Sequence, residues 1–164
     1  MKVCIITTED PFYTSKIMNE LIKNKSISIE LVIMHNGFIN IKRIYSTFFI
    51  YGFIKFIKTV ISVIYNSIKG GIVKNLFVKS KIEVLETNNI NSADVIDKLK
   101  SKEIDIIISN NCPQRIKNKV LETSKIASIN VHLGLLPNYR GLFPLFHAFI
   151  RDEKYVGVSI HYMN

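Results

Sequence analysis

The chain has 164 residues, of which 48% are hydrophobic and 21% are charged. This composition is that of one globular domain with a buried core rather than of a disordered chain, and the sequence has no internal repeat or low-complexity tract. Twenty-two Lys and Arg against 13 Asp and Glu give a formal net charge of +9. Such an excess favours anionic partners (phosphates, nucleic acid or a membrane surface), although a solvated Lys-rich surface explains it equally well.

The first 34 residues predict a strand, a helix and a second strand. Residues 3–7 are apolar and partly β-branched, which is typical of a buried strand. A helix is expected from Asp10 and Pro11, because Asp caps helices and Pro suits the first turn. Residues 29–34 read as the next strand, and this β-α-β order predicts a parallel sheet. The turn at 7–10 contains no glycine, so its backbone is poorly suited to cradle a phosphate.

Residues 40–81 form an aromatic and basic stretch, for which we expect one or two helices broken near Gly52 and at Gly70-Gly71. Lys55 interrupts its apolar run, which is too short for the roughly 20 residues of a transmembrane helix. Between Glu30 and Glu83 the chain has no acidic residue and eight basic ones: Lys42, Arg43, Lys55, Lys58, Lys69, Lys74, Lys79 and Lys81. Three alternatives remain: helices packed on the sheet or on a second subunit, a surface lying on a membrane, or part of a substrate pocket. Packing is favoured, because aromatic stripes at helical spacing are usually core.

The next segment predicts strands at 83–85 and 104–109 on either side of a helix. Asn91 is expected to cap that helix, which continues through Lys100. Residues 110–113, Asn-Asn-Cys-Pro, are turn formers that end the second of these strands, and a further helix is expected over 115–122.

A short strand at 127–131 then leads into a loop containing Pro137, Gly141 and Pro144. Because side chains alternate along a strand, Asn130 and His132 point the same way at its carboxyl end, where ligands bind in open α/β sheets. An isolated Asn-x-His pair would be a capping Asn and a surface His. Beyond the loop, we expect a helix over 142–151, which carries His147, and a last strand over 156–161.

The residues around this pair form a longer string with fixed spacing. It reads Asn130-x-His132-x-Gly134-Leu135-Leu136-Pro137-x-Tyr139-Arg140-Gly141-x-x-Pro144. This string resembles the central motif of the formyltetrahydrofolate-dependent formyltransferases, whose members act on methionyl-tRNA, glycinamide ribonucleotide and nucleotide-linked amino sugars. Gly134 is a departure, since many members carry Ser there. Residues 157–161, Gly-Val-Ser-Ile-His, resemble the Gly-Val-Thr-x-His segment that follows the motif in the family.

The resemblance implies an α/β, Rossmann-like formyltransferase fold, with a mostly parallel, twisted sheet flanked by helices. Residues 1–164 would be its N-terminal catalytic domain, incomplete at the C-terminus, with a helical basic and aromatic insertion at about 40–81. The implied activity is that of an enzyme, an N-formyltransferase that moves a formyl group from N10-formyltetrahydrofolate to a primary amine. No metal is implied, and the spacings of His132, His147 and His161 match no metal-binding pattern.

Roles for individual residues follow from the same resemblance. Asn130 and His132 stand at the catalytic positions, where hydrogen-bond donors stabilise a developing oxyanion and a His can relay protons near neutral pH. The pterin end of the folate would be held by residues 110–116, largely through backbone groups: Asn110, Asn111, Cys112, Pro113, Gln114, Arg115 and Ile116. Tyr139, Arg140 and Gly141 would contact the substrate.

The expected substrate is a nucleotide-linked amino sugar, because the basic excess suits a diphosphate. Glycinamide ribonucleotide is disfavoured, because enzymes for it carry a Gly-rich turn after the first strand. Two alternatives are a methionyl-tRNA formyltransferase-like enzyme and a non-catalytic module that binds folate or a membrane. A homodimer is a further expectation; a membrane surface is a less favoured partner, and DNA is not an expected one.

The family completes its catalytic set with an Asp that follows the position matching His161, and the sequence ends before it. Asp152 and Glu153 follow a predicted surface helix and are not expected to replace it. We therefore expect the protein to continue past Asn164, with an intact mass above the 18.8 kDa of these residues. Cys4 and Cys112 lack paired-cysteine spacing, and no secretory leader precedes the first strand, so a cytoplasmic location is expected.

Overall fold

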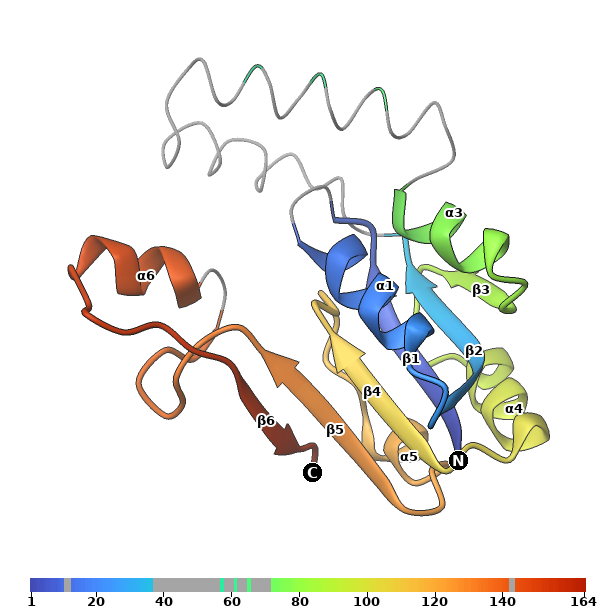
Figure 1. The fold of residues 1–164 in the computed structure, drawn as a ribbon. Coiled ribbons are helices and arrows are strands. Elements are labelled where there is room, and N and C mark those ends of the chain that lie inside the picture. The colour runs from blue at the N-terminus through green and yellow to red at the C-terminus, as the bar shows by residue number, and fades with distance from the viewer. Residues whose placement is uncertain (11–12, 37–56, 58–60, 62–64, 66–71, 142–143) are drawn as a thin grey trace.

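The computed structural model describes residues 1–10, 13–36, 57, 61, 65, 72–141 and 144–164 (Figure 1). Six strands form one sheet in the order β3-β2-β1-β4-β5-β6. The strands are β1 (Lys2–Thr8), β2 (Ser28–His35), β3 (Val84–Thr87), β4 (Ile106–Asn110), β5 (Ala127–His132) and β6 (Ser159–Tyr162). The helices are α1 (Thr14–Lys23), α3 (Ile72–Lys79), α4 (Ala93–Lys102), α5 (Asn118–Leu121) and α6 (Pro144–Ile150). Strands β1 to β5 pair in parallel and β6 pairs antiparallel with β5, which confirms the expected mostly parallel α/β sheet.

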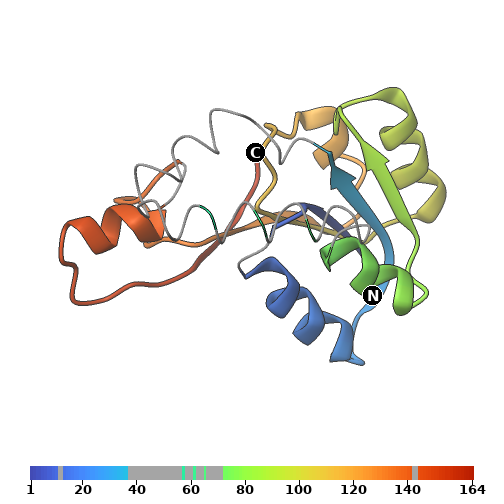
Figure 2. The ribbon, with the colours of Figure 1, turned by 90° about the horizontal axis from the view of Figure 1, so that it is seen from above.

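Helices cover both faces of the sheet, with α1 and α3 on one side and α4 and α5 on the other (Figure 2). Alternation along β1 divides its side chains between two cores. Val3 and Ile5 pack with Met18 of α1 and Phe77 of α3, and the intervening Cys4 and Ile6 belong to the core of α4 and α5. These residues are fully buried. A strand buried on both faces reads as a continuous apolar run, which is why the sequence indicates it so clearly.

Helix α1 begins later than the sequence predicts. Its first residue is Thr14 rather than a position next to Asp10, and Pro11 lies outside the described residues. The Asp10 carboxylate still serves the helix start, since its Oδ2 accepts from the Thr14 backbone N–H at 3.3 Å and from the Thr14 hydroxyl at 2.7 Å. The predicted capping chemistry is therefore present, although it acts from four residues before the helix.

Helix α3 lies within the aromatic and basic stretch and packs its Val73 and Phe77 into the core. Its amino end meets the turn after β1, because the Glu9 carboxylate accepts hydrogen bonds from the backbone N–H groups of Val73 (3.2 Å) and Lys74 (2.7 Å). The turn without glycine thus places the Glu9 carboxylate at the amino end of α3, where the helix dipole favours a negative charge. The helix breaks expected at Gly52 and Gly70-Gly71 lie outside the described residues.

The elements between β3 and β5 differ from expectation at their starts. Ser92 rather than Asn91 is the N-cap residue of α4, which runs to Lys102. Asn91 instead bridges two loops: its amide nitrogen donates to the Arg115 carbonyl at 2.9 Å, and its side-chain oxygen accepts from the Lys117 N–H at 2.7 Å. These bonds hold residues 115–117 in an extended loop, so α5 starts only at Asn118 instead of 115.

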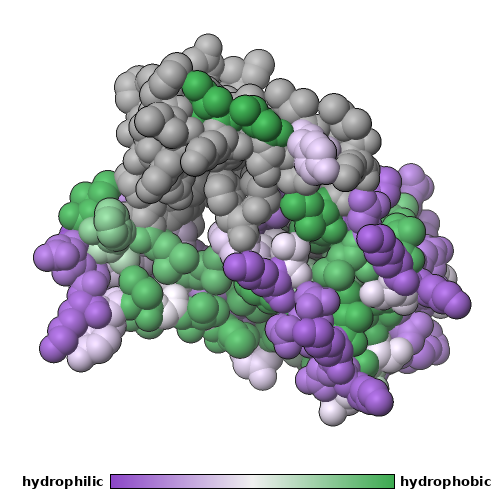
Figure 3. Space-filling view, turned by 45° about the horizontal axis from the view of Figure 1, so that its top comes forward, coloured by the Kyte–Doolittle hydropathy of each residue, from purple (hydrophilic) through white to green (hydrophobic). Residues whose placement is uncertain are grey.

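The last strand is shorter than predicted, and the C-terminal elements are thinly covered. Helix α6 occupies Pro144–Ile150, and β6 begins at Ser159 rather than at 156. Figure 3 shows apolar side chains on the surface toward α6 and β6, while hydrophilic side chains gather over the side of α1 and α3. Phe149 is 82% exposed and Tyr162 is 74% exposed. Within the described parts of the chain, no helix has the length and apolar character needed to cross a bilayer.

Candidate active site

The candidate site lies at the carboxyl ends of two neighbouring strands, β4 and β5. Their register pairs Ser109 with Asn130 and Asn110 with Val131, so the loop after β4 starts beside the Asn-x-His segment. On its other side β4 pairs with β1. From β1 the chain crosses over in one direction to β2 and β3, and from β4 it continues in the opposite direction to β5, so the strand order reverses between β1 and β4. Such a point is where open α/β sheets bind ligands. The Asn111 side chain donates to the Asp10 carboxylate at 3.4 Å across this position.

Asn130 is oriented by a histidine from the edge strand. Its Nδ2 lies 3.2 Å from Nε2 of His161, its register partner on β6. The other ring nitrogen, Nδ1, lies 2.8 Å from the Tyr162 carbonyl, which can only accept, so Nδ1 carries the proton. In the neutral ring Nε2 is then an acceptor, and Asn130 must point its NH₂ group toward it. One N–H of that group remains for another acceptor.

His132 is held by the motif loop in the opposite tautomer. Its Nε2 lies 2.5 Å from the Tyr139 carbonyl, so here Nε2 is the protonated nitrogen. Gly134 allows this packing: a Cβ there would stand 2.6 Å from the Pro144 Cβ and 3.2 Å from His132 Nε2. Gly134, where many members of the resembling family carry Ser, thus lies where the motif loop closely approaches Pro144 at the start of α6.

The three residues expected to contact substrate occupy different environments. Tyr139 is only 7% exposed, and its hydroxyl donates to the Glu153 carboxylate. Arg140 is exposed and forms no ion pair within the described part of the chain. Gly141 is also exposed, with φ at +89°, a conformation that favours glycine. Of the three, Arg140 is the one whose charge is available to a ligand.

The loop expected to hold the folate is braced from outside by residues that follow β3. Gln114 accepts from the Ile90 N–H at 2.7 Å and donates to Asn89 at 3.0 Å, so its side chain is engaged. Ile116 packs against the core of α4 and α5, Pro113 is half-buried, and Arg115 is exposed. This bracing leaves the loop's ligand contacts to its backbone and to the residues nearest β4.

Asn110 is the residue of this loop whose buried side-chain amide lacks hydrogen bonds within the described chain. It is 1% exposed, and neither its amide nitrogen nor its side-chain oxygen has a hydrogen-bond partner among the described residues. An unpaired buried carboxamide costs on the order of 1–3 kcal/mol, so such a group in a native protein needs an explanation. A ligand with one donor and one acceptor on the same edge would satisfy it. A pterin ring offers such an edge, so the residues present fit the expected cofactor.

The two thiols are free. Burial raises the pKa of both, that of Cys4 most. The Cys112 thiol also donates a hydrogen bond to the Gln114 carbonyl at 3.3 Å. A thiol with a raised pKa is a poor nucleophile at neutral pH. Neither is therefore a candidate for covalent catalysis.

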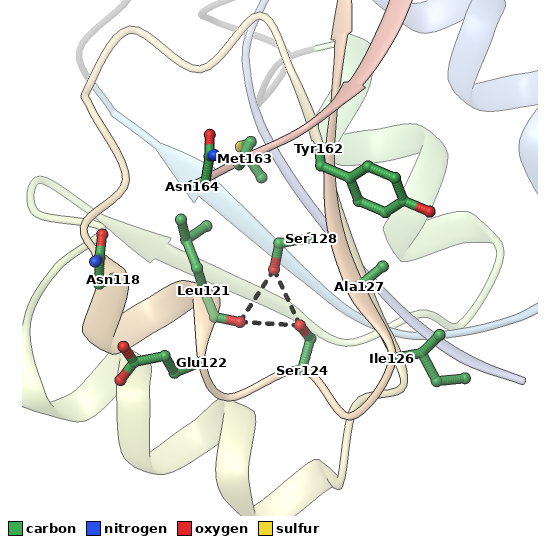
Figure 4. A pocket seen from close by; sticks show the side chains of 10 residues that line it. All are labelled: Asn118, Leu121, Glu122, Ser124, Ile126, Ala127, Ser128, Tyr162, Met163 and Asn164. Atoms are coloured by element: carbon green, nitrogen blue, oxygen red, sulfur yellow. Dashed lines mark hydrogen bonds between the residues drawn. The ribbon is translucent and has the colours of Figure 1, made fainter.

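A hollow of about 380 Å³ lies at the opposite end of β5, between α5 and the end of β6 (Figure 4). The hydroxyls of Ser124 and Ser128 at its floor both donate to the Leu121 carbonyl, at 2.9 and 3.1 Å. No described His or Cys lines it, and neither Asn130 nor His132 does. Among the described residues there is also no group of three or more His, Cys, Asp or Glu placed to hold a metal ion. Asn130 and His132, rather than the hollow, are therefore the candidate catalytic residues.

Comparison with known proteins identifies the family to which the chain belongs. A sequence profile described as formyl transferase matches residues 58–164, so the chain belongs to the formyl transferase family. Methionyl-tRNA formyltransferase of Mycoplasmopsis pulmonis is 37% identical over 97 residues, which are 59% of this chain and 33% of that protein. The bifunctional polymyxin resistance protein ArnA of Wigglesworthia glossinidia brevipalpis is 40% identical over 91 residues, 56% of this chain and 14% of that protein. The matched region thus spans a third or less of these two relatives.

Solved structures share the fold at low sequence identity. Phosphoribosylglycinamide formyltransferase from Bacillus halodurans superposes with a TM-score of 0.67 at 17% identity, covering 100% of this chain and 72% of that one. A sugar N-formyltransferase from a Shewanella species gives a TM-score of 0.54 at 18% identity, covering 100% of this chain and 51% of that one. The formyltransferase fold expected from the sequence is confirmed.

Three residues that support the site were not identified as such from the sequence. His161 orients Asn130, Ser159 donates to the Gly134 carbonyl at 2.8 Å and accepts from the Leu136 N–H at 3.0 Å, and Glu153 accepts from the Tyr139 hydroxyl. The sequence indicated positions 159 and 161 through the family resemblance of residues 157–161 and through their shared face of a strand, but it gave no partner for either residue. Glu153 follows α6 with no periodicity to place it, so only the folded chain reveals its partner.

Proposed function

We propose that the protein transfers a formyl group from N10-formyltetrahydrofolate to the primary amine of a nucleotide-linked amino sugar. The observation that carries the proposal is the pair Asn130 and His132, each held by one hydrogen bond at the carboxyl end of β5. Bound N10-formyltetrahydrofolate supplies an activated formyl group. The matched region spans only a third or less of the two relatives described, so the activity is proposed for the whole protein of which these residues form the matched domain.

Asn130 supplies a fixed donor. With its amide oriented by His161, the remaining Nδ2–H can bind an oxygen that gains negative charge during transfer, and a preorganised donor of this kind lowers a barrier by about 3–4 kcal/mol. His132 would take the proton that the neutral amine loses as its nitrogen bonds to the formyl carbon. It would return that proton to N10 as the bond between N10 and the formyl carbon breaks and tetrahydrofolate leaves. Arg140, exposed and without an ion-pair partner in the described chain, supplies a cation that suits a diphosphate.

The loop after β4 is proposed to hold the pterin. Asn110 would pair with the ring edge, and Cys112 lies in the same loop with its thiol partly buried. Alkylation gives a readout independent of turnover: iodoacetamide should modify Cys112 slowly, and folate should slow it further. A Cys4→Ala variant removes the second thiol from the measurement. Unchanged labelling of Cys112 at saturating folate would count against the proposed pocket.

The test of activity uses native protein, N10-formyltetrahydrofolate and a panel of amines: nucleoside-diphosphate-linked amino sugars, methionyl-tRNA and glycinamide ribonucleotide. We expect a mass gain of one formyl group on an amino sugar. His132→Ala and Asn130→Ala should each lower kcat about 100- to 1,000-fold, while the controls His147→Ala and Asn118→Ala, taken from outside the pair, should leave it unchanged. Formylation of methionyl-tRNA alone would replace the proposed substrate.

Methionyl-tRNA is the second candidate, favoured by the 37% identity to the M. pulmonis enzyme and by the net charge of +9. If every amine stays unmodified while folate still protects Cys112, the protein is a folate-binding module and the enzymatic proposal fails. A cytoplasmic location belongs to the same proposal and is supported by the two free thiols. A homodimer is likewise a proposal, which sedimentation of the native protein would test.

A further inference from the structure

We infer that Tyr139 and Glu153 are positioning residues that hold His132 with its proton on Nε2, which leaves Nδ1 as the ring atom that accepts the proton of the substrate amine. The inference rests on the proposed formyl transfer, because it names the atom through which His132 would act. It extends that proposal to two residues that lie outside the Asn-x-His pair. Neither is a catalytic residue, since both act through His132.

The first step is the tautomer. His132 Nε2 lies 2.5 Å from the Tyr139 carbonyl oxygen, and a carbonyl oxygen has no proton to give. Nε2 is therefore the donor, and the lone pair of the neutral ring lies on Nδ1. No described residue forms a hydrogen bond with Nδ1, so this atom is free to exchange a proton with a ligand.

The second step is what fixes the Tyr139 carbonyl. The Tyr139 N–H donates to the Leu135 carbonyl at 3.2 Å, which closes the loop on itself. The Tyr139 ring is 7% exposed, its hydroxyl donates to Glu153, and the guanidinium carbon of Arg151 lies 5.6 Å from the ring centroid. The bond to the Glu153 carboxylate raises the pKa of the Tyr139 phenol, so the phenol stays a donor at neutral pH.

The third step is what fixes Glu153. Its backbone N–H donates to the Ala148 carbonyl at 3.1 Å, in the last turn of α6. Asp152 before it has φ at +52°, the left-handed conformation in which helices commonly end. Glu153 is thus attached to the carboxyl end of α6, while Pro144 at the amino end packs against Gly134. Helix α6 contacts the motif loop at both ends, so its position sets the carbonyl that binds His132.

The experiment is a long-range ¹H–¹⁵N correlation spectrum of the native protein labelled with ¹⁵N-histidine, recorded near neutral pH, where Nδ1 and Nε2 give distinct shifts. The spectrum of His132→Gln assigns the His132 signals. We expect the wild-type ring to be in the Nε2–H tautomer. Tyr139→Phe and Glu153→Ala should give an averaged, mixed tautomer, while Glu153→Gln, whose side-chain oxygen can still accept from the phenol, should restore the wild-type spectrum.

Two matched controls separate positioning from general damage. Tyr155→Phe removes a hydroxyl from an exposed tyrosine of the same segment, and Asp152→Asn neutralises the carboxylate next to Glu153; neither should alter the His132 signals. In the formylation assay, Tyr139→Phe and Glu153→Ala should lower kcat about fivefold with KM for the amine unchanged, as expected for the loss of one hydrogen bond. Glu153→Gln should again behave as wild type.

The inference is overturned if wild-type His132 is protonated on Nδ1, or if Tyr139→Phe keeps the wild-type tautomer. These outcomes do not depend on turnover. A native protein that formylates no amine yet shows the expected spectra would retain the positioning of His132 and refute the proposed function. An active enzyme in which Tyr139→Phe leaves the His132 spectrum unaltered would retain the proposed function and refute the positioning of His132.

Discussion

The centre of the sheet and its C-terminal edge are built differently. In the centre, β1 and β2 lie between helix layers, and Val3 to Ile6 are fully buried. At the C-terminal end, β6 is an edge strand, and Val158, Ile160 and Tyr162 on one face of its segment are 54%, 66% and 74% exposed. Asn130 and His132 lie on β5, next to the thinly covered end. The comparison teaches that this chain separates the part that stabilises the fold from the part that carries the polar site.

The largest difference in the free energy of unfolding is expected between substitution of the buried Phe77 and substitution of the exposed Phe149. Phe77→Ala in α3 should lower the free energy of unfolding by about 3–5 kcal/mol, because the side chain is fully buried between α3 and the sheet. Phe149→Ala in α6, where the side chain is 82% exposed, should change it by less than about 0.5 kcal/mol. Urea unfolding measures both. Equal losses would mean that α6 is as well covered as α3, and the contrast between the centre of the sheet and its C-terminal edge would fail.

A middle-sized effect is expected at the turn after β1. Glu9→Ala removes the acceptor of the Val73 and Lys74 N–H groups and should destabilise the fold by about 1–2 kcal/mol. Glu20→Ala, which loses an exposed ion pair with Lys23 in α1, is the control and should cost less than about 0.5 kcal/mol. If Glu9→Ala unfolds at the same urea concentration as Glu20→Ala, the carboxylate does not secure α3.

The smallest effect is expected from the two surface ion pairs of Glu83, the residue before the edge strand β3. Hydrogen bonds from Lys102 and Lys98 lower the pKa of Glu83 below its usual 4.5. A lowered pKa stabilises the fold above the unfolded-state value, and that contribution disappears as the pH falls through the folded-state pKa. Glu83→Gln should therefore lower the urea midpoint slightly at pH 7 and not at all once the pH lies below the folded-state pKa of Glu83. A difference that persists at acid pH would need another cause.

The sequence anticipated the elements whose pattern reflects burial on both faces. The continuous apolar runs of β1, β2, β4 and β5 were predicted within two residues of their ends, and the motif placed Asn130 and His132 at the end of a strand. The boundaries that differed depend on contacts between distant residues. Asn91 leaves its expected capping role to bind Arg115 and Lys117, and this delays α5. Spacing along the chain carries no record of such pairings.

The polar partners of the site escaped prediction for the same reason. The Tyr139 hydroxyl meets Glu153 only because α6 returns the chain to the motif loop, and Asn110 becomes an unpaired buried amide only once β4 takes its place between β1 and β5. Motif resemblance named Tyr139 and Asn110, but it indicated neither the partner of Tyr139 nor the burial of Asn110. The geometry that fixes their protons and orientations comes from the folded chain.

The antiparallel pairing of β6 makes the site sensitive to strand register. Asn130 faces His161 and His132 faces Ser159, whose hydroxyl also ties down the motif loop. A shift of β6 by one residue would reverse its faces, bringing Ile160 and Tyr162 toward the polar pair and turning both of its site residues outward. Only one register of the short edge strand therefore keeps its site residues facing Asn130 and His132. Loss of this pairing should remove both the protection of the β6 amides from hydrogen exchange and the orientation of Asn130.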